Sequence, residues 1–334
     1  MFLINVPIAL AAAVVLLFDR KKTISKQDII DRNAHFDIVG TLALAAGLVL
    51  TIYGSTLGPQ DGWTSMSVLP LIIGGVALIL FYLGWALFKP KPAIDLKLIR
   101  NSETALTLLI SLITVITAMS VLFIVPLILE SVQGYSALNA GLAMLPQGIM
   151  MGVGIIVGEI FLKKRWASFR MIVMAGLLVL GLSTASMFWF EMSTSIWASA
   201  LILAARGLSM GMVIQPLLNE MLATLRPEEA ADGNTLFNVA QQLGGAIGIS
   251  AAATVFQTRA TGYIGDVLAS YHINVGPIHI GGTSSALSQL PAAILDQINS
   301  AIFHSFHDTV LVLAGVALLG LLLSLFLKPT KNKT

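Results

Sequence analysis

A single arginine lies halfway along an apolar stretch that is long enough to cross a lipid bilayer. The stretch runs from Ile196 to Leu222, and Arg206 lies near its centre. Roughly 20 helical residues span the hydrocarbon core, and a centred arginine costs about 2.5 to 3.5 kcal/mol on insertion scales. Such a residue usually faces a bundle interior or a water-filled cavity, so Arg206 is the first candidate for function.

Helical spacing divides the residues around Arg206 between two faces. Gln215, nine positions later, points to the side opposite Arg206, so the two cannot line the same cavity wall, and we expect the face of Arg206 to be the functional one. That face is shared by Ser199, Met210, Val213 and Leu217. Gly207 and Gly211, four residues apart, form a seam of small residues that lets another helix approach closely.

Other apolar stretches carry polar and small residues at helical spacing, for which lining a pathway and packing between helices both remain open. The candidates for a substrate or proton pathway, besides Arg206, are Thr107, Ser111, Thr114, Asn238, Gln241 and Gln242. The candidates for helix packing or bending are Gly207, Gly211, Pro146, Gly148, Gly152, Gly244 and Gly248. Three acids at the ends of apolar stretches are interpreted as solvated anchors rather than proton carriers: Glu130, Glu159 and Glu220.

Signals for an enzyme or a metal site are weak. The segment Gly207–Gly211 matches G-x-S-x-G, but a nucleophile elbow requires a strand-turn-helix context, and this segment lies within one apolar helix. His304, His307 and Asp308 have a spacing that could hold a metal ion, but interfacial polar residues at a helix start are the preferred interpretation. Cysteine is absent, and every histidine lies in a predicted loop or at the end of an apolar stretch. We therefore expect no enzyme activity, no metal and no cofactor.

The composition predicts an integral membrane protein. Hydrophobic residues make up 56% of the 334-residue chain and charged residues 11%, with a mean hydropathy of +0.88, which is too apolar for a water-soluble globule. The basic residues form short clusters between apolar stretches, which is typical of membrane topology and argues against binding to nucleic acid. The lipid bilayer is therefore the first expected partner.

Nine apolar spans are predicted, and the basic residues orient them. The spans are 2–18, 37–57, 66–88, 104–129, 139–162, 171–190, 195–222, 235–257 and 306–327. Seventeen of the 19 lysines and arginines fall on one side of this arrangement, Arg259 in the long predicted loop 258–305 falls on the other, and Arg206 lies within a span. The positive-inside rule then predicts a multi-pass cell-membrane protein with a cytoplasmic C-terminus and an N-terminus outside.

Four segments resemble the fourteen-helix drug:proton antiporters of the major facilitator superfamily. Phe2–Pro7 (FLINVP) is similar to the start of their sixth helix, and Phe36–Gly40 (FDIVG) with Gly62 and Trp63 is similar to their extra central hairpin. The other two are Val132–Leu142 (VQGYSALNAGL), similar to their ninth-to-tenth helix junction, and Phe237–Gly248 (FNVAQQLGGAIG), similar to their thirteenth helix. The resemblance covers essentially the whole chain and makes the nine spans helices six to fourteen.

The resemblance implies a domain organisation and a missing half. Residues 1–36 would be the last helix of an N-terminal bundle with a cytoplasmic linker, 37–103 the central two-helix hairpin with its linker, and 104–334 the C-terminal six-helix transporter bundle. The expected partners are a small-molecule substrate, a proton and the absent helices one to five. Arg206 would be the counterpart of the arginine-bearing fourth helix in the C-terminal half.

Two departures from the family pattern concern charge. The superfamily often has a glycine, then an acid four residues later and a basic residue in the cytoplasmic loop of this region, whereas Gly158 is followed by Leu162 and Lys163. Gln241 stands where the family commonly has arginine. Two interpretations of function remain: proton-coupled efflux of drugs or other small amphipathic compounds by an N-terminally truncated transporter, or a non-transporting fragment of such a protein.

Overall fold

The computed structural model describes residues 37–89, 92, 94–273 and 291–328 of the chain. Within these ranges every regular element is a helix, and eight helices are long and apolar enough to cross a membrane. The predicted all-α membrane fold is therefore confirmed, whereas the predicted first span, 2–18, and domain 1–36 lie outside the described residues. The chain divides at Ile38 into two units, the second of which is Val39–Thr334. Apart from the first residue of α2, the elements below belong to the second unit.

The first two helices form a closely packed hairpin. α2 (Ile38–Asp61) and α3 (Leu69–Phe88) are joined through Gly62, whose φ of +89° favours glycine. A Cβ placed on Gly75 of α3 would lie 2.6 Å from the main-chain nitrogen of Thr51 in α2. The two backbones can approach this closely because the residue at the contact has no side chain.

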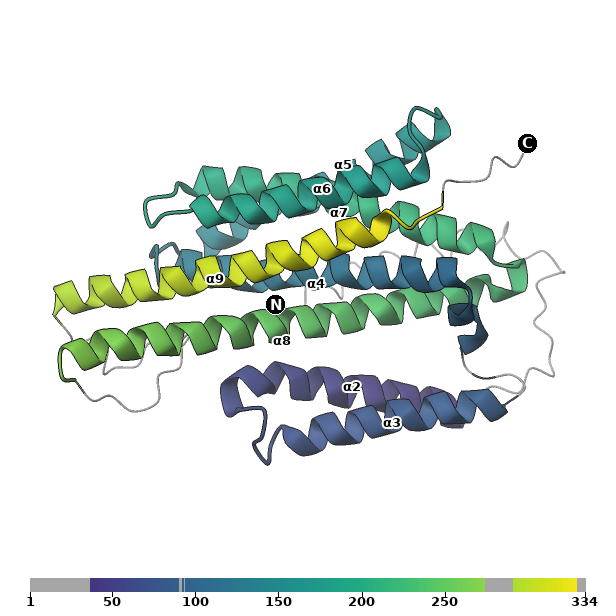
Figure 1. The fold of residues 1–334 in the computed structure, drawn as a ribbon, viewed down its shortest axis with the longest axis horizontal. Coiled ribbons are helices and arrows are strands. Elements are labelled where there is room, and N and C mark those ends of the chain that lie inside the picture. The colour runs from purple at the N-terminus through teal and green to yellow at the C-terminus, as the bar shows by residue number, and fades with distance from the viewer. Residues whose placement is uncertain (1–36, 90–91, 93, 274–290, 329–334) are drawn as a thin grey trace, which may run out of the picture. The chain divides into compact units, whose positions relative to one another are not determined.

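Six further helices form the bundle that carries the candidate site (Figure 1). They are α4 (Ser102–Ser131), α5 (Ala137–Lys163), α6 (Phe169–Ser186), α7 (Ile196–Thr224), α8 (Ala230–Ser270) and α9 (Ala292–Ser324). α7 packs against α5, α6 and α4, while α4, α8 and α9 lie side by side. Side-chain caps fix four of the helix starts, because each accepts a hydrogen bond from a main-chain nitrogen in the first turn. These caps are Asn101, Ser136, Ser168 and Ser195.

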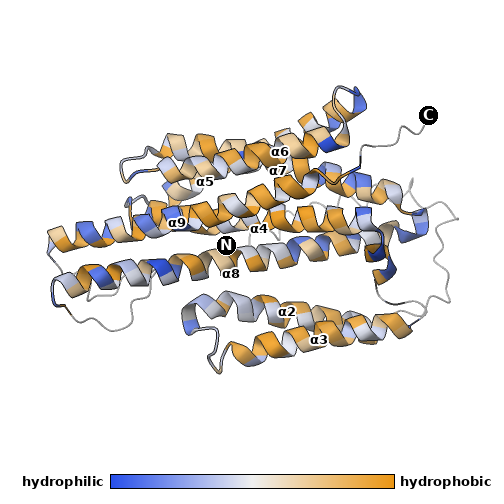
Figure 2. Cartoon of the chain, viewed as in Figure 1, coloured by the Kyte–Doolittle hydropathy of each residue, from blue (hydrophilic) through white to orange (hydrophobic). Residues whose placement is uncertain are grey.

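Apolar residues predominate along most of the helices (Figure 2), and many of their large apolar side chains are exposed. Leu42 is 64% exposed, Leu201 73% and Phe326 73%. Exposed apolar surface of this kind is expected where lipid rather than water surrounds the helices. Lys164, at the end of α5, lies with its ammonium nitrogen 4.7 Å from the ring centroid of Trp166, a pairing suited to the membrane interface.

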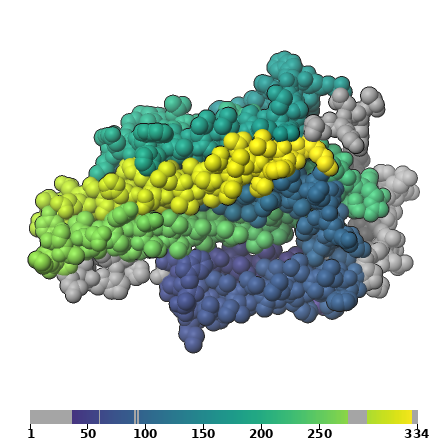
Figure 3. Space-filling model, in the orientation of Figure 1, coloured from purple at the N-terminus to yellow at the C-terminus, as the bar shows by residue number. Residues whose placement is uncertain are grey.

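The predicted long loop 258–305 is wrong over much of its length. α8 continues to Ser270 and α9 already begins at Ala292, so the two helices run on past the apolar stretches, by about 20 Å for the 13 extra residues of α8. Ile264 and Leu268 of α8 and Ile298 of α9 are buried in one apolar cluster, and these parts of α8 and α9 lie against each other (Figure 3). Hydropathy alone missed this extension because its outward faces are polar.

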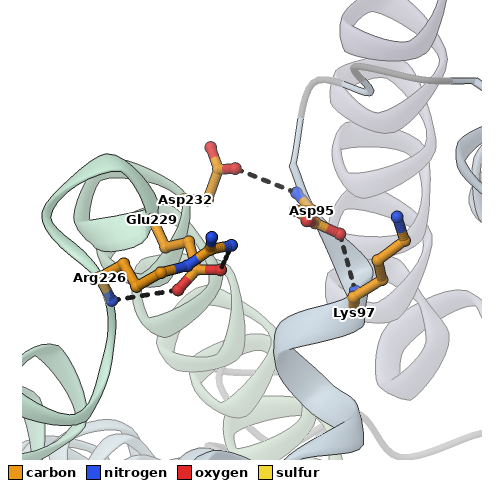
Figure 4. A network of polar contacts seen from close by, with 5 residues as sticks. All are labelled: Asp95, Lys97, Arg226, Glu229 and Asp232. Atoms are coloured by element: carbon orange, nitrogen blue, oxygen red, sulfur yellow. Dashed lines mark hydrogen bonds and ion pairs between the residues drawn. The ribbon is translucent and has the colours of Figure 1, made fainter.

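A polar network ties the linker before α4 to the start of α8 (Figure 4). The main-chain nitrogen of Asp95 donates to Oδ2 of Asp232 at 3.3 Å, and Oδ1 of Asp95 accepts from the main-chain nitrogen of Lys97 at 2.9 Å. Nearby, Oε2 of Glu229 accepts from the main-chain nitrogen of Arg226 at 3.1 Å. The Glu229 carboxylate also raises the pKa of Arg226 by hydrogen bonding and charge, so this arginine stays cationic at any physiological pH.

Basic residues from several helix ends lie at one end of the bundle, where the start of α4, the α5–α6 connection and the ends of α7 and α9 meet; we call this the basic end. It is marked by Lys164 at the end of α5, Arg226 before α8 and Lys328 after α9. The Nζ atom of Lys328 lies 2.6 Å from Oε1 of Glu103 at the start of α4, which joins the first and last helices of the bundle there.

Candidate functional site

Arg206 lies wholly inside the bundle with no exposed surface. Its Nη1 donates to the hydroxyl oxygen of Thr184 in α6, and its Nη2 donates to the main-chain carbonyl oxygen of Thr117 in α4 at 3.0 Å. The Thr184 hydroxyl in turn donates to the carbonyl oxygen of Leu180 at 2.7 Å. One guanidinium therefore connects three helices through neutral acceptors.

The positive charge of Arg206 has no carboxylate partner among the described residues. Its Nε atom has no hydrogen-bond partner in that part of the chain, and neither has the buried hydroxyl of Ser199, two turns earlier on the same face of α7. A buried charge is stable only when its environment compensates it, and two neutral acceptors do so incompletely. The two hydrogen bonds use two of the five N–H groups of the guanidinium, and the buried Nε–H is a donor suited to an anionic group such as a carboxylate.

The predicted face of Arg206 is the buried face of α7. Ser199, Met210, Val213 and Leu217 are at most 4% exposed, so these residues pack in the bundle interior. Gln215, on the opposite face, is half-buried and its neighbour one turn on, Asn219, is exposed. The outward face of α7 therefore carries the carboxamides of Gln215 and Asn219, and the inward face carries the guanidinium of Arg206.

The three candidate hydroxyls of α4 are also interior. Thr107, Ser111 and Thr114 are at most 4% exposed. Ser111 donates to the carbonyl oxygen of Leu108 and Thr114 to that of Ile110, each at 2.8 Å. Hydroxyls that bond to their own helix need no outside partner, so these two side chains are satisfied within α4.

The three candidate carboxamides of α8 lie apart from Arg206. Asn238 and Gln242 are exposed and Gln241 is half-buried, and Nδ2 of Asn238 donates to the carbonyl oxygen of Asn234 at 2.8 Å. The seven predicted pathway residues therefore do not form one cluster: four are buried within the bundle and three lie on the outward face of α8.

The candidate packing glycines fall into two groups. A Cβ on Gly207 would overlap the carbonyl oxygen of Gln147 in α5, and one on Gly211 would overlap that of Met151. Towards α4, a Cβ on Gly244 would lie 2.8 Å from the carbonyl oxygen of Leu112, and one on Gly248 2.5 Å from that of Ile116. At these four positions any side chain would force the helices apart.

The remaining predicted residues of α5 behave differently. A Cβ on Gly148 or Gly152 would meet nothing within 4 Å, because both lie on the exposed side of the helix. Pro146 lies inside α5, which continues as one helix from Ala137 to Lys163. Gly154, which is paired with Gly158 at the same four-residue spacing, approaches α7 instead: its Cβ would overlap the carbonyl oxygen of Leu208.

Sequence reasoning missed two polar side chains that lie near Arg206. Thr184 accepts its hydrogen bond, and Gln147 packs its backbone against Gly207 while its Oε1 has no partner among the described residues. A glutamine within an apolar stretch is an intramembrane polar residue, so Gln147 could have been selected. Nothing in the sequence distinguishes Thr184 from the many other hydroxyls.

A cavity of about 1570 Å³ opens at the basic end of the bundle. Its walls come from the start of α4, the connection between α5 and α6, and the ends of α7 and α9. The side chains that line it include Glu103, Thr107, Arg165, Glu220 and Lys328. It thus carries both signs of charge, and of the predicted pathway residues only Thr107 reaches it.

Two of the residues considered for a metal site, His307 and Asp308, have other partners. Nε2 of His307 lies 2.9 Å from the carbonyl oxygen of Phe190, and Oδ2 of Asp308 accepts from the Tyr263 hydroxyl at 2.8 Å. Among the described residues, no group of three or more histidines, cysteines or acids could hold a metal ion.

Comparison with known proteins points to a family of transporters. A family model described as Major Facilitator Superfamily matches residues 1–249. The chain is 26% identical over 261 residues to the uncharacterized MFS-type transporter YhcA of Bacillus subtilis, which covers 78% of this chain and 48% of that protein. It is 28% identical over 231 residues to the lincomycin resistance protein LmrB of Listeria innocua, covering 68% of this chain and 48% of that protein.

A longer match extends along nearly the whole chain. The multidrug export protein EmrB of Escherichia coli K12 is 26% identical over 343 residues, which covers 98% of this chain and 64% of EmrB. The chain spans about half the length of YhcA and LmrB.

A solved structure supports the fold. A bacterial homologue of the human lysosomal transporter Spinster, in an inward-facing and occupied conformation, superposes with a TM-score of 0.52 at 14% identity, covering 86% of this chain and 64% of that one.

Proposed function

The chain belongs to the Major Facilitator Superfamily, and from this premise we propose that it is part of a proton-coupled transporter that exports small amphipathic compounds across the cell membrane. The observation that carries the proposal is the match of the family model to residues 1–249 together with a buried guanidinium that lacks a carboxylate partner in the described residues. Named relatives are multidrug and antibiotic resistance proteins, which supports export of small molecules. Membership of a transporter family implies translocation rather than catalysis.

Arg206 is the charged centre of the proposed mechanism. Such transporters bind substrate near the middle of the membrane between two bundles and rock about it. Because its two acceptors are neutral, the Arg206 guanidinium can pair with a carboxylate of a second bundle in one conformation and with a carboxylate of a substrate in another. We place Thr107, Ser111 and Thr114 around the same interior, and Asn238, Gln241 and Gln242 on the face that would meet a second bundle.

The complementary bundle is part of the proposal. α8 presents exposed carboxamides, and polar groups left in hydrocarbon cost several kcal/mol each, so this face requires another protein surface or water. We therefore propose that transport needs an N-terminal bundle of the kind found in full-length relatives. The distribution of the basic residues separately supports a cytoplasmic C-terminus. The chain alone would then insert in the membrane without transporting.

Drug susceptibility tests the proposal. In a bacterium deleted for its own efflux pumps, the chain is expressed alone, with a complementary N-terminal bundle, and with that bundle and Arg206→Ala. Resistance to one or more amphipathic antibiotics should rise only in the second strain. A panel in which no compound distinguishes the second strain from the empty host, despite equal membrane abundance of both parts, would contradict export.

A further inference from the structure

The cavity at the basic end, about 1570 Å³ in volume, has an apolar wall that continues onto the outside of the bundle. Trp166, Met171 and Phe326 line the cavity, and they are also 63%, 59% and 73% exposed. Exposed apolar side chains at the end of a membrane bundle meet lipid, and tryptophan is enriched at the level of the headgroups. The apolar wall is therefore continuous with surface that lipid covers.

The charged groups of the cavity leave one cation without a partner. Nζ of Lys328 and Oε1 of Glu103 form an ion pair at 2.6 Å, and Glu220 also has an interaction of its own. The Arg165 guanidinium, in contrast, has no ion pair or hydrogen bond within the described part of the chain. The charge that complements this cavity is therefore negative.

Arg165 occupies a backbone position that usually belongs to glycine. α5 ends in a Schellman arrangement, in which the main-chain nitrogen of Trp166 donates to the carbonyl oxygen of Phe161 at 3.0 Å and that of Arg165 to Leu162 at 3.1 Å. The φ angle of Arg165 is +56°, a left-handed conformation that glycine adopts without steric cost and arginine does not. Residues held in this way cluster at ligand sites, and Arg165 lines the cavity.

Two buried hydroxyls near the start of α4 also lack partners. Thr107 lines the cavity and is 4% exposed, and Thr104, one turn earlier, is 1% exposed. Neither hydroxyl has a hydrogen-bond partner among the described residues, whereas Ser111 and Thr114 further along α4 donate to carbonyl oxygens. Because an unpaired buried hydroxyl is costly, the Thr107 donor favours an acceptor bound in the cavity.

The start of α6 adds main-chain donors to the same wall. Ser168 caps this helix, because its Oγ accepts from the main-chain nitrogen of Met171 at 3.3 Å, and Ser168 and Phe169 both line the cavity. The first N–H groups of a helix have no intrahelical acceptor, and the positive end of the helix dipole favours a phosphate. Arg165, Thr107 and the start of α6 therefore share one kind of complementary group, an anion rich in oxygen acceptors.

We propose that this cavity binds the phosphate headgroup of an anionic membrane lipid, whose acyl chains lie against Trp166, Met171 and Phe326. Arg165 and the start of α6 contact the phosphate, and Thr107 donates to another oxygen of the headgroup. A free phosphate offers the same charge, but the apolar wall fits an ester that carries acyl chains. Basic pockets of membrane proteins on the cytoplasmic side bind such headgroups. The proposal does not depend on export.

Lipid titration of the purified, delipidated 334-residue chain in detergent tests the proposal, with bound lipids counted by native mass spectrometry. The probe is phosphatidylglycerol, and phosphatidylcholine, whose phosphate is neutralised by choline, should bind more weakly. Arg165→Asn keeps a residue that accepts the left-handed conformation and should weaken phosphatidylglycerol binding about tenfold. Thr107→Val should weaken it roughly two- to fivefold. Glu103→Gln frees the ammonium of Lys328 and should strengthen it roughly two- to fivefold.

Lys164→Asn is the matched control, because it removes the neighbouring positive charge, whose ammonium lies over the Trp166 ring rather than in the cavity wall. It should leave binding unchanged. Equal losses from Arg165→Asn and Lys164→Asn would indicate general attraction to a basic surface and would overturn the proposal, as would equal affinities for the two lipids. Displacement of phosphatidylglycerol by inorganic phosphate would exclude lipid as the occupant. Weaker or unchanged binding in Glu103→Gln would also contradict the proposal, and a folding defect cannot imitate the predicted gain.

Discussion

Arg206 of α7 and Thr117 of α4 are joined by a hydrogen bond of 3.0 Å from the guanidinium to a main-chain carbonyl oxygen. A carbonyl carries no net charge, so the bond fixes the position of the guanidinium without neutralising it. The positive charge is thereby held in the bundle interior at a known place. This is a geometry suited to meeting a negative group supplied from outside the described residues.

The first prediction separates a functional from a structural role for Arg206. Replacing an incompletely paired buried charge with an apolar residue of similar size is often neutral or stabilising, so Arg206→Met should keep or raise the melting temperature in detergent while abolishing export by the assembled transporter. Arg259→Met, at an exposed arginine of α8, is the control. A melting temperature lowered in proportion to the loss of export would show that Arg206 is needed only for folding.

The second prediction concerns the close contact between α5 and α7. Gly207→Ala places a methyl group against the carbonyl oxygen of Gln147 and should destabilise the bundle by about 1 to 3 kcal/mol through overpacking. Gly148→Ala, in α5, adds the same methyl group where nothing lies within 4 Å and should be neutral. Thermal unfolding of both variants checks this pair, and equal melting temperatures would argue against the close approach of α5 and α7.

The sequence predicted much of this fold because hydropathy and helix length are local properties. Six of the eight described spans overlap their predicted ranges closely, and the interior position of Arg206 was predicted from its place in an apolar stretch. α8 and α9 were predicted too short because contacts between Ile264, Leu268 and Ile298 stabilise their extensions. These residues are too far apart in sequence for a hydropathy window to include both sides of the contact.

The site was less predictable for the same reason. Spacing correctly separates Arg206 and Gln215 to opposite faces of one helix, but which face turns inward depends on α4 and α6. Glu159 was interpreted as a solvated anchor because its partners, Asn219 and Gln215, lie some 60 positions away in sequence. Only the packing of α5 on α7 brings them together.

The third prediction concerns the extension of α8 and α9. Leu268→Ala removes a buried side chain at a site where such truncations cost about 2 to 5 kcal/mol, and should increase amide hydrogen exchange in 258–270 and 292–305 but not in α4. Asp296→Ala, at an exposed position in α9, is the control. Unchanged exchange in the Leu268 variant would mean that the two extensions do not support each other.

Topology provides the fourth prediction. Seventeen of the 19 basic residues share one predicted side. A reporter enzyme that is active only outside the cytoplasm should therefore be active when fused at Asp61 or Glu191, and one that is active only in the cytoplasm should be active when fused at Lys164 or Lys328. Fusions at all four positions, compared at equal expression, check the orientation. Activity of the cytoplasmic reporter at Asp61 would contradict the predicted arrangement of the spans.

The central claim is that this chain completes a proton-driven export pathway when joined to a complementary bundle, and dye transport in vesicles tests it most directly. Everted vesicles are prepared with the chain alone, with an N-terminal bundle from a relative alone, or with both. A proton gradient is generated across their membranes, and uptake of a fluorescent amphipathic dye is followed. Uptake should occur only with both parts and should collapse when the gradient is dissipated. Uptake by the chain alone, or uptake by the pair that continues unchanged after the gradient is dissipated, would contradict the account.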